Sequence, residues 1–93
     1  MMAAEKIMTL HPAGKAGVNI EKAKYDAVRE AILALIGVRG EMPFGELADA
    51  VGAQLANFDG SVGWYTITVK LDLEARGEIE RIPGSGPQRL RLK

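Results

Sequence analysis

The clearest periodic signal in the chain is a run of apolar residues at helical spacing in its first half. Apolar side chains recur every three or four positions at Tyr25, Val28, Ile32 and Leu35. Asn19 precedes this run and is a favourable N-cap residue, and Gly37 follows it and can end a helix. The pattern therefore predicts a first helix between these two residues.

A second helix is predicted after Met42-Pro43, because the residue before a proline disfavours helical backbone. Its apolar face consists of Phe44, Leu47, Ala48, Val51 and Leu55. We expect this helix to end near Ala56, since residues 57–60 contain the turn formers asparagine, aspartate and glycine.

Residues 61–76 fit two structures. As a helix, they carry one apolar stripe at Val62, Tyr65, Val69 and Leu73, and a second, nearly opposite stripe at Trp64, Ile67, Leu71 and Ala75. As a strand, residues 67–74 alternate apolar and polar side chains without a break, and β-branched residues are frequent. The local pattern favours the strand. The possible caps Asp59 and Ser61, the length of the segment and the stop at Gly77 favour a helix.

The two ends of the chain differ in pattern. Residues 78–82 and 88–92 are short strand candidates, and the Pro- and Gly-rich residues 83–87 between them predict a hairpin. Residues 1–18 show no steady period, and we interpret them as an N-terminal arm that packs on the rest. Residues 19–93 would then form a single domain, as expected for a chain of 93 residues.

Composition narrows the class of protein. The chain has no cysteine, and hence no disulfide or thiolate metal site, and it has no apolar run close to the length of a membrane span. Its N-terminus lacks the pattern of a signal peptide, so we expect a cytoplasmic protein that makes no membrane contact.

The residues also argue against catalysis. His11 is the only histidine, and no nucleophile has an evident base partner. Gly14-Lys15 lacks the upstream glycine and the following hydroxyl residue of a phosphate-binding loop. We therefore expect a non-enzymatic protein that uses no cofactor and no metal.

Charge is balanced in total but uneven along the chain. Twelve basic residues match twelve acidic ones, yet all charged residues between positions 41 and 60 are acidic. Most of the charged residues among the last eighteen are basic. In the last predicted strand, Arg89, Arg91 and Lys93 share one face. This face would either contact phosphates or serve as an ordinary polar surface beside Glu78 and Glu80.

Three helices followed by a β-hairpin resemble a winged helix-turn-helix domain, and the likeness covers roughly residues 20–93. The specific resemblance lies in residues 71–82, LDLEARGEIERI, which look like the end of a recognition helix that runs through a glycine into the first wing strand. The resemblance implies an α+β, mainly α fold with a C-terminal wing, and it favours a helix at residues 61–76. The chain also resembles a set of short, uncharacterised prokaryotic proteins in residues 11–15 and 58–65, which supplies no activity.

Winged helices mostly bind DNA through the third helix and the wing, and many others bind proteins. If this chain binds duplex DNA, as a small regulator would, the resemblance implies contacts from Lys70, Arg89, Arg91 and Lys93. The third helix itself is poor in the side chains that read bases. The alternative is a protein-interaction or dimerisation surface at Trp64, Ile67 and Leu71. Because most winged helices bind DNA and the predicted wing is basic, we favour DNA binding narrowly over a protein contact.

Trp64 allows three interpretations on this basis. Large apolar residues are mostly core residues. A second apolar stripe is nevertheless surplus for so small a three-helix core, and an exposed patch is unfavourable. We therefore expect Trp64 to be largely buried, under the N-terminal arm or a second subunit. If it is exposed, this face is open to a ligand such as DNA.

Overall fold

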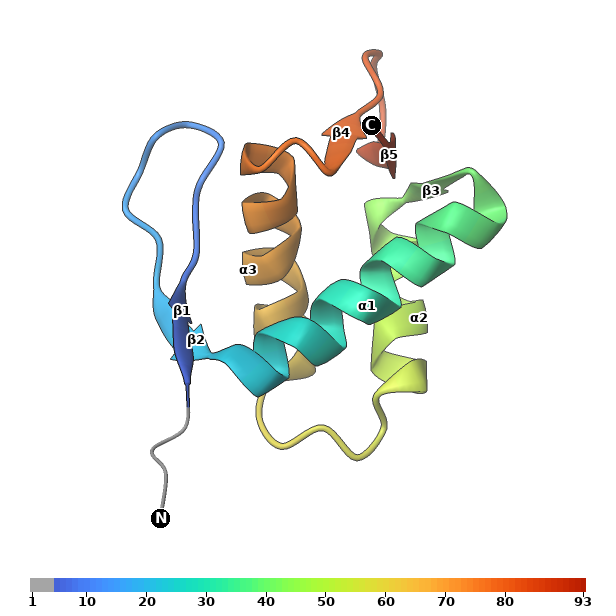
Figure 1. The fold of residues 1–93 in the computed structure, drawn as a ribbon. Helices are drawn as coiled ribbons and strands as arrows, with labels where there is room; N and C mark the ends of the chain where they lie inside the picture. Colours follow the sequence, from blue (N-terminus) through green and yellow to red (C-terminus); the bar gives the residue numbers. More distant parts are fainter. Residues whose placement is uncertain (1–4) are drawn as a thin grey trace.

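The computed structural model describes residues 5–93, which form three helices and two small antiparallel sheets (Figure 1). In chain order the elements are β1 (Lys6–Met8), β2 (Asn19–Glu21), α1 (Lys22–Arg39), β3 (Glu41–Pro43), α2 (Phe44–Gln54), α3 (Val62–Ala75), β4 (Ile79–Arg81) and β5 (Arg89–Leu92). The fold is therefore α+β, with most residues of the regular elements in helices.

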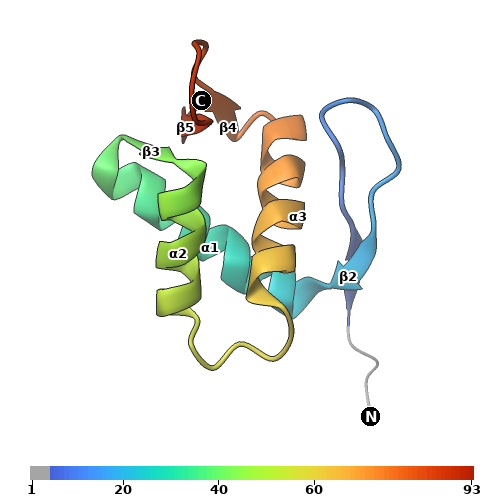
Figure 2. The same ribbon diagram turned by 180° about the vertical axis from the view of Figure 1, so that it is seen from behind.

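The helices form the body of the molecule, and a sheet lies on each side of α3. Helices α2 and α3 run side by side, and α1 crosses both of them (Figures 1 and 2). Strands β1 and β2 pack against α1, with Ile7 opposite Ile20, and the loop between them lies beside α3 (Figure 1). The larger sheet has the order β3-β5-β4, and it places Leu90 of β5 between Met42 of β3 and Arg81 of β4.

One core joins the helices to the larger sheet. Its fully buried side chains include Val28, Ile32, Ile36, Met42, Leu47, Val51, Val69, Leu73, Ile79 and Leu90. Burial of a residue of this size stabilises the fold by roughly 1.5–3 kcal/mol before the entropy cost of ordering it. The first two predicted helices supply their apolar faces to this core, so the helical periodicity correctly predicted most of their buried residues.

The ends of α1 differ from the prediction. Asn19 does not cap the helix, because it lies in β2 opposite Met8, and the helix begins only at Lys22. At the other end the helix continues past Gly37 to Arg39. Gly40 ends it with a positive φ of 85°, and its N–H donates to the carbonyl of Ile36. A left-handed residue of this kind favours glycine.

Helix α2 begins at Phe44 as predicted and ends at Gln54, two residues before the predicted end. The residues before it form a strand that the sequence pattern did not predict. Pro43 has no N–H to donate, but β3 lies at the edge of the sheet, where a proline is tolerated.

The prediction of a helix at residues 61–76 is confirmed. The side chain of Ser61 accepts a hydrogen bond from the Trp64 N–H at 3.3 Å and caps α3. At the other end Gly77 donates to Glu74 O and Glu78 donates to Leu73 O, which is the Schellman arrangement. Gly77 has a φ of 76°, so the expected glycine stop is present.

The C-terminal hairpin, residues 79–92, is also as predicted, with β4 and β5 antiparallel around the loop at residues 82–88. The N-terminal residues differ from the expected arm without regular structure. Residues 5–21 form a second β-hairpin, which we call the N-terminal hairpin, and its loop spans residues 9–18.

Candidate functional site

Helix α3 has an inner face packed in the core and an outer face that is only partly covered. Val69 and Leu73 are fully buried on the inner face, whereas Trp64 and Ile67 keep 45% and 49% of their surface exposed. Leu71 is half-buried. The expectation that Trp64 is largely buried is therefore wrong for the single chain, because the chain supplies only a partial cover.

Trp64 is held in place by its aromatic neighbours. Its ring meets the ring of Tyr65 edge-on at 5.0 Å between centroids, and Tyr65 meets Phe58 in the same manner at 5.1 Å. The ammonium group of Lys24 lies 5.7 Å from the centre of the Tyr65 ring. Edge-to-face contacts of this kind stabilise and orient aromatic side chains. The exposed indole is therefore a fixed surface feature.

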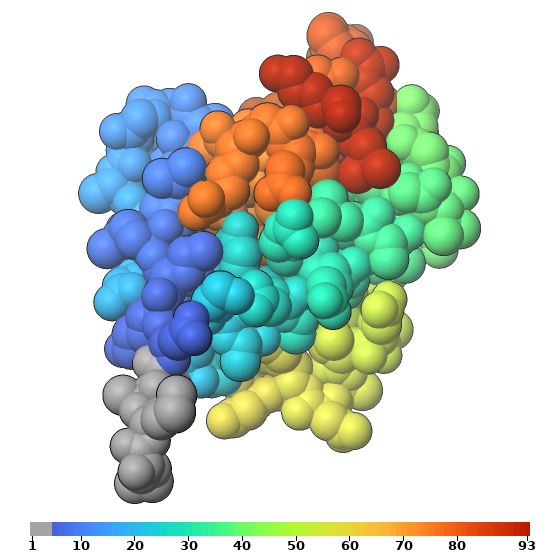
Figure 3. All heavy atoms as spheres, viewed as in Figure 1, coloured from blue at the N-terminus to red at the C-terminus, as the bar shows by residue number. Residues whose placement is uncertain are grey.

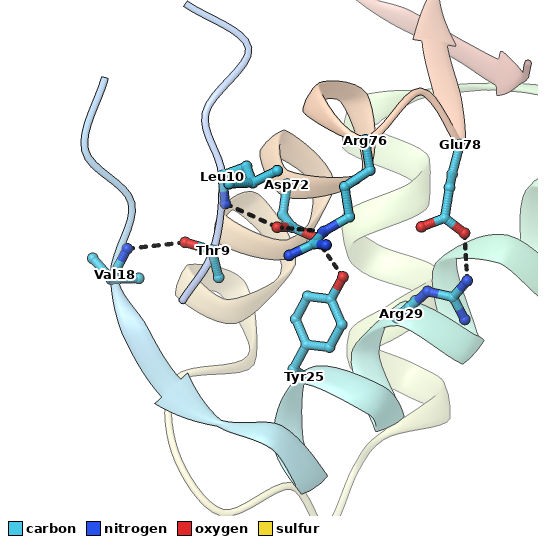
Figure 4. A network of polar contacts seen from close by, with 8 residues as sticks. All are labelled: Thr9, Leu10, Val18, Tyr25, Arg29, Asp72, Arg76 and Glu78. Atoms are coloured by element: carbon cyan, nitrogen blue, oxygen red, sulfur yellow. Dashed lines mark hydrogen bonds and ion pairs between the residues drawn. The ribbon is translucent and has the colours of Figure 1, made fainter. Parts of the chain in front are cut away.

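The partial cover of α3 is the N-terminal hairpin, which Asp72 holds in place. The Asp72 carboxylate is fully buried, and its Oδ1 accepts the backbone N–H of Leu10 at 2.8 Å. The Tyr25 hydroxyl donates to Oδ2, and Arg76 Nε donates to both oxygens at 2.9–3.0 Å (Figure 4). One carboxylate therefore links the hairpin, α1 and α3.

This arrangement supplies the donors that a buried carboxylate requires. Burial raises the pKa of Tyr25, and its hydrogen bond to Asp72 adds to the shift, so the phenol stays a donor. A second ion pair lies close by, between Arg29 of α1 and Glu78 (Figure 4). Within this cluster, the hydrogen bond from Leu10 to Asp72 ties the N-terminal hairpin to α3.

The loop of the hairpin is closed by Thr9 and Gly17. Thr9 is buried; its N–H donates to Val18 O, and its hydroxyl accepts the Val18 N–H at 2.9 Å (Figure 4). A Cβ atom at Gly17 would lie 1.7 Å from the carbonyl oxygen of Thr9, so only glycine fits there. The loop is thus built to hold its two arms close together next to α3.

A groove of about 150 Å³ separates the hairpin loop from α3. Leu10 and Val18 line it from the hairpin, Trp64 and Leu71 line it from α3, and Leu10, Val18 and Trp64 remain exposed at its rim. We call the exposed set Leu10, Val18, Trp64 and Ile67 the apolar face. An apolar cavity of this volume accepts a benzene-sized group, so the groove has room for one apolar side chain.

The residues expected to contact DNA differ in exposure. Lys70 is only 4% exposed, with its Nζ 3.4 Å from Glu74 Oε1 and 5.3 Å from the centre of the Phe44 ring. Burial lowers the pKa of Lys70, and the charge of Glu74 opposes that shift. Its ammonium group is thus directed to internal partners. Arg89, Arg91 and Lys93 are exposed.

The arginines of the C-terminal hairpin already have partners. Arg89 lies 3.0 Å from Glu41, and Arg91 lies 2.7 Å from Glu80 on the neighbouring strand. Within residues 5–93, which contain all of the arginines, each arginine has a carboxylate within 4 Å. The basic sequence of the C-terminus therefore does not produce a basic surface of corresponding strength.

Sequence reasoning placed Trp64, Ile67 and Leu71 on one side of a helix, and the structure brings them together there. It missed Asp72, Leu10 and Val18. The spacing of Asp72 and Arg76, four residues apart on a helix, was a usable signal for an ion pair. The N-terminal residues were one of the two expected covers of Trp64, and the structure places them beside α3 as a hairpin rather than as an arm without regular structure.

The described residues contain no helix long and apolar enough to cross a membrane and no group of three or more His, Cys, Asp or Glu side chains placed to hold a metal ion. The fold and the surface features define a small α+β domain with an apolar face beside its third helix. The chain belongs to DUF6958, a family of unknown function, whose model matches residues 6–90. No curated protein and no solved structure matches the chain.

Proposed function

We propose that this chain is a non-enzymatic winged-helix module that binds through its apolar face, and that the partner is a second copy of the chain. The observation that carries the proposal is the exposure of Trp64 and Ile67 on α3, next to exposed Leu10 and Val18 of the N-terminal hairpin. Soluble monomers tend to avoid contiguous apolar surface of this kind, and such surface commonly marks a protein contact.

The winged-helix assignment is supported by the order and pairing of the elements. Three helices are followed by the β4–β5 hairpin, and β3, which lies between the first two helices, joins that hairpin to give the order β3-β5-β4. Helix α3 runs through Gly77 directly into β4, as the recognition helix of a winged helix runs into its wing.

A second copy is favoured by charge. The chain has no net charge, and its arginines are paired internally, so long-range repulsion between two copies is weak. Tryptophan is also among the residues most often found at the centre of interfaces. A standard interface buries about 800 Å² per partner, which is about one seventh of the 5693 Å² surface of this chain.

The test is the oligomeric state of the full chain in sedimentation experiments, from low micromolar to near-millimolar concentration. We expect the wild type to dimerise within this range, and a Trp64→Arg, Ile67→Arg variant to remain monomeric. Val38→Arg is the matched control, because Val38 is 87% exposed at the far end of α1. A wild type that is monomeric throughout overturns the proposal, as does equal weakening by the Val38 variant.

DNA binding is the second candidate. It is supported by the winged-helix order and by the exposure of the C-terminal arginines, since surface ion pairs are worth only about 0–1 kcal/mol and phosphates can replace the carboxylates. Titration with a non-specific duplex at two salt concentrations tests it. If DNA binds, changing Arg89 and Arg91 to glutamate should lower the affinity for all duplexes alike. It should also reduce the slope of log affinity against log salt concentration by about one unit per lost contact.

A further inference from the structure

A second cavity, distinct from the groove beside Trp64, lies between the tip of the N-terminal hairpin and the C-terminal hairpin. It has a volume of about 460 Å³, which falls within the roughly 300–1,000 Å³ of small-molecule sites. The last turns of α3 separate the N-terminal residues from the C-terminal strands on the molecular surface (Figure 3). Glu74, in the last turn of α3, is one of the residues that line this cleft.

Glu74 of the cleft has a buried carboxylate of which only one oxygen has a partner. Its side chain is only 6% exposed, and Oε1 lies 2.9 Å from Arg81 Nε and 3.4 Å from Lys70 Nζ. The other oxygen, Oε2, is buried and has no hydrogen-bond partner among residues 5–93. A buried carboxylate oxygen without a donor is costly, and each such oxygen in a folded protein requires an explanation. Oε2 has almost no accessible surface in this structure, so a bound hydroxyl or amino group supplies the missing donor once the side chains over Oε2 shift.

Two acidic and two basic side chains line the cleft, Glu74 and Glu80 against Arg81 and Lys93, and both carboxylates have basic partners. Glu74 is opposed by both Lys70 and Arg81, and Glu80 at the cleft wall is balanced by Arg91 at 2.7 Å. Arg81 uses its Nε for Glu74 and is about half exposed, so its terminal N–H groups are accessible to the cleft. The ammonium group of Lys93 adds another positive charge at the wall. An anionic group would be attracted here.

His11 adds a donor from the opposite wall. Its Nδ1 accepts the backbone N–H of Ala13 at 3.1 Å, which places the proton of a neutral imidazole on Nε2. His11 is half-buried and lines the cleft from the N-terminal hairpin. The cleft therefore combines donors from both hairpins with one buried acceptor.

We propose that this cleft binds a small organic anion that also carries a hydroxyl or amino group, with the anion held by Arg81, Lys93 and His11 and the donor group bonded to Glu74 Oε2. The ligand chemistry is that of a phosphorylated or carboxylated polyol, or of an amino acid. The cleft and the apolar face are lined by different parts of α3, although His11 lines both the cleft and the groove beside Trp64.

The test is a titration of the full chain followed by two-dimensional ¹H–¹⁵N NMR, with three simple probes. Glycerol 3-phosphate carries the anion and the hydroxyl groups, inorganic phosphate carries only the anion, and glycerol carries only hydroxyl groups. We expect glycerol 3-phosphate to shift the amide signals of His11, Ala13 and residues 79–81 and to bind about tenfold more tightly than phosphate, since one added charge-assisted hydrogen bond is worth about that factor. Glycerol should produce no saturable shift.

Two variants assign the roles. Glu74→Gln should abolish the advantage of glycerol 3-phosphate over phosphate, whereas Glu30→Gln, on the exposed side of α1, should leave it unchanged. Arg81→Gln changes a half-exposed residue, so the fold should be kept. It should lower the affinity for both anions about fivefold or more. Equal affinity for the two anions in the wild type overturns the proposal. Shifts spread over all basic residues, or no shift at all, also contradict it.

Discussion

The two β-hairpins of this domain flank the same helix but are held by different forces. The C-terminal hairpin buries Ile79 and Leu90 in the core and pairs with β3 as a third strand. The N-terminal hairpin is an isolated pair of three-residue strands, which is marginal by itself. It is attached to the helices mainly through the buried side chain of Ile20 and the hydrogen bond from Leu10 to Asp72.

The two hairpins also expose different kinds of side chain. The C-terminal hairpin exposes charges that are already paired, at Arg89 with Glu41 and Arg91 with Glu80. The N-terminal hairpin exposes Leu10 and Val18 next to Trp64. The C-terminal hairpin is thus held by side chains buried in the core, whereas the N-terminal hairpin and α3 together expose the apolar face.

A large loss of stability is expected from removing the carboxylate that holds the N-terminal hairpin. Asp72→Ala leaves the Tyr25 hydroxyl and the Leu10 N–H without their acceptor and should lower the free energy of unfolding by about 3 kcal/mol. Urea denaturation measures this loss. The exposed Asp49 of α2 is the control, and Asp49→Ala should change stability by no more than about 0.5 kcal/mol. A loss below about 1 kcal/mol for Asp72→Ala would show that the network does not hold the hairpin.

A pair of leucine substitutions compares the hairpins directly. Leu90→Ala removes a fully buried side chain and should cost about 2–5 kcal/mol. Leu10→Ala removes a half-exposed one and should cost less than about 1 kcal/mol. Thermal or urea unfolding of both variants checks the contrast, and similar losses for the two would remove the distinction on which the comparison rests.

The sequence was sufficient for the parts of this fold that depend on local pattern. The apolar spacing at Val28 and Ile32 marked α1, and the glycine after residue 76 marked the end of α3. The ambiguity at residues 61–76 has a physical cause. Helix α3 carries apolar side chains on two sides because one side faces the core and the other faces the hairpin groove, so it lacks the single stripe of an ordinary amphipathic helix.

The remaining features depend on contacts between residues far apart in the chain. The pairing of residues 6–8 with 19–21 and of 41–43 with 89–91 involves short strands, for which periodicity has little meaning. The burial of Lys70 was also not evident, since it follows from the positions of Phe44 and Glu74 around it. The apolar stripe on α3 and the N-terminal residues as a possible cover could be predicted, but the hairpin structure of those residues and their anchor at Asp72 could not.

A charge exchange should have a smaller effect and would sharpen the account of the C-terminal hairpin. Arg91→Glu places two carboxylates opposite each other on β4 and β5 and should destabilise the fold by up to about 1 kcal/mol. Adding Glu80→Arg restores an ion pair with the two charges exchanged between the strands, and it should recover most of the lost stability. If the double variant is no more stable than the single one, the cross-strand pair has no measurable role.

The smallest effect is a pH dependence from Lys70. Because burial lowers its folded pKa below the usual 10.5, the unfolded chain binds more protons than the folded chain between the two values. Stability should therefore rise with pH in this window, and Lys70→Met should lack that contribution. Unfolding at roughly pH 8 and pH 9.5 measures it while most of the tyrosine is still protonated. Parallel curves for the wild type and the variant would contradict the assignment.

The central claim is that the apolar face is covered by a second copy of the chain, and Trp64 is the only tryptophan to report on it. The most direct measurement is the emission maximum of Trp64 in the intact protein as a function of protein concentration. The account predicts emission typical of a partly hydrated indole at low concentration, and a shift to shorter wavelength as the dimer forms and covers the ring. Emission that stays at the long-wavelength position up to near-millimolar concentration would contradict it.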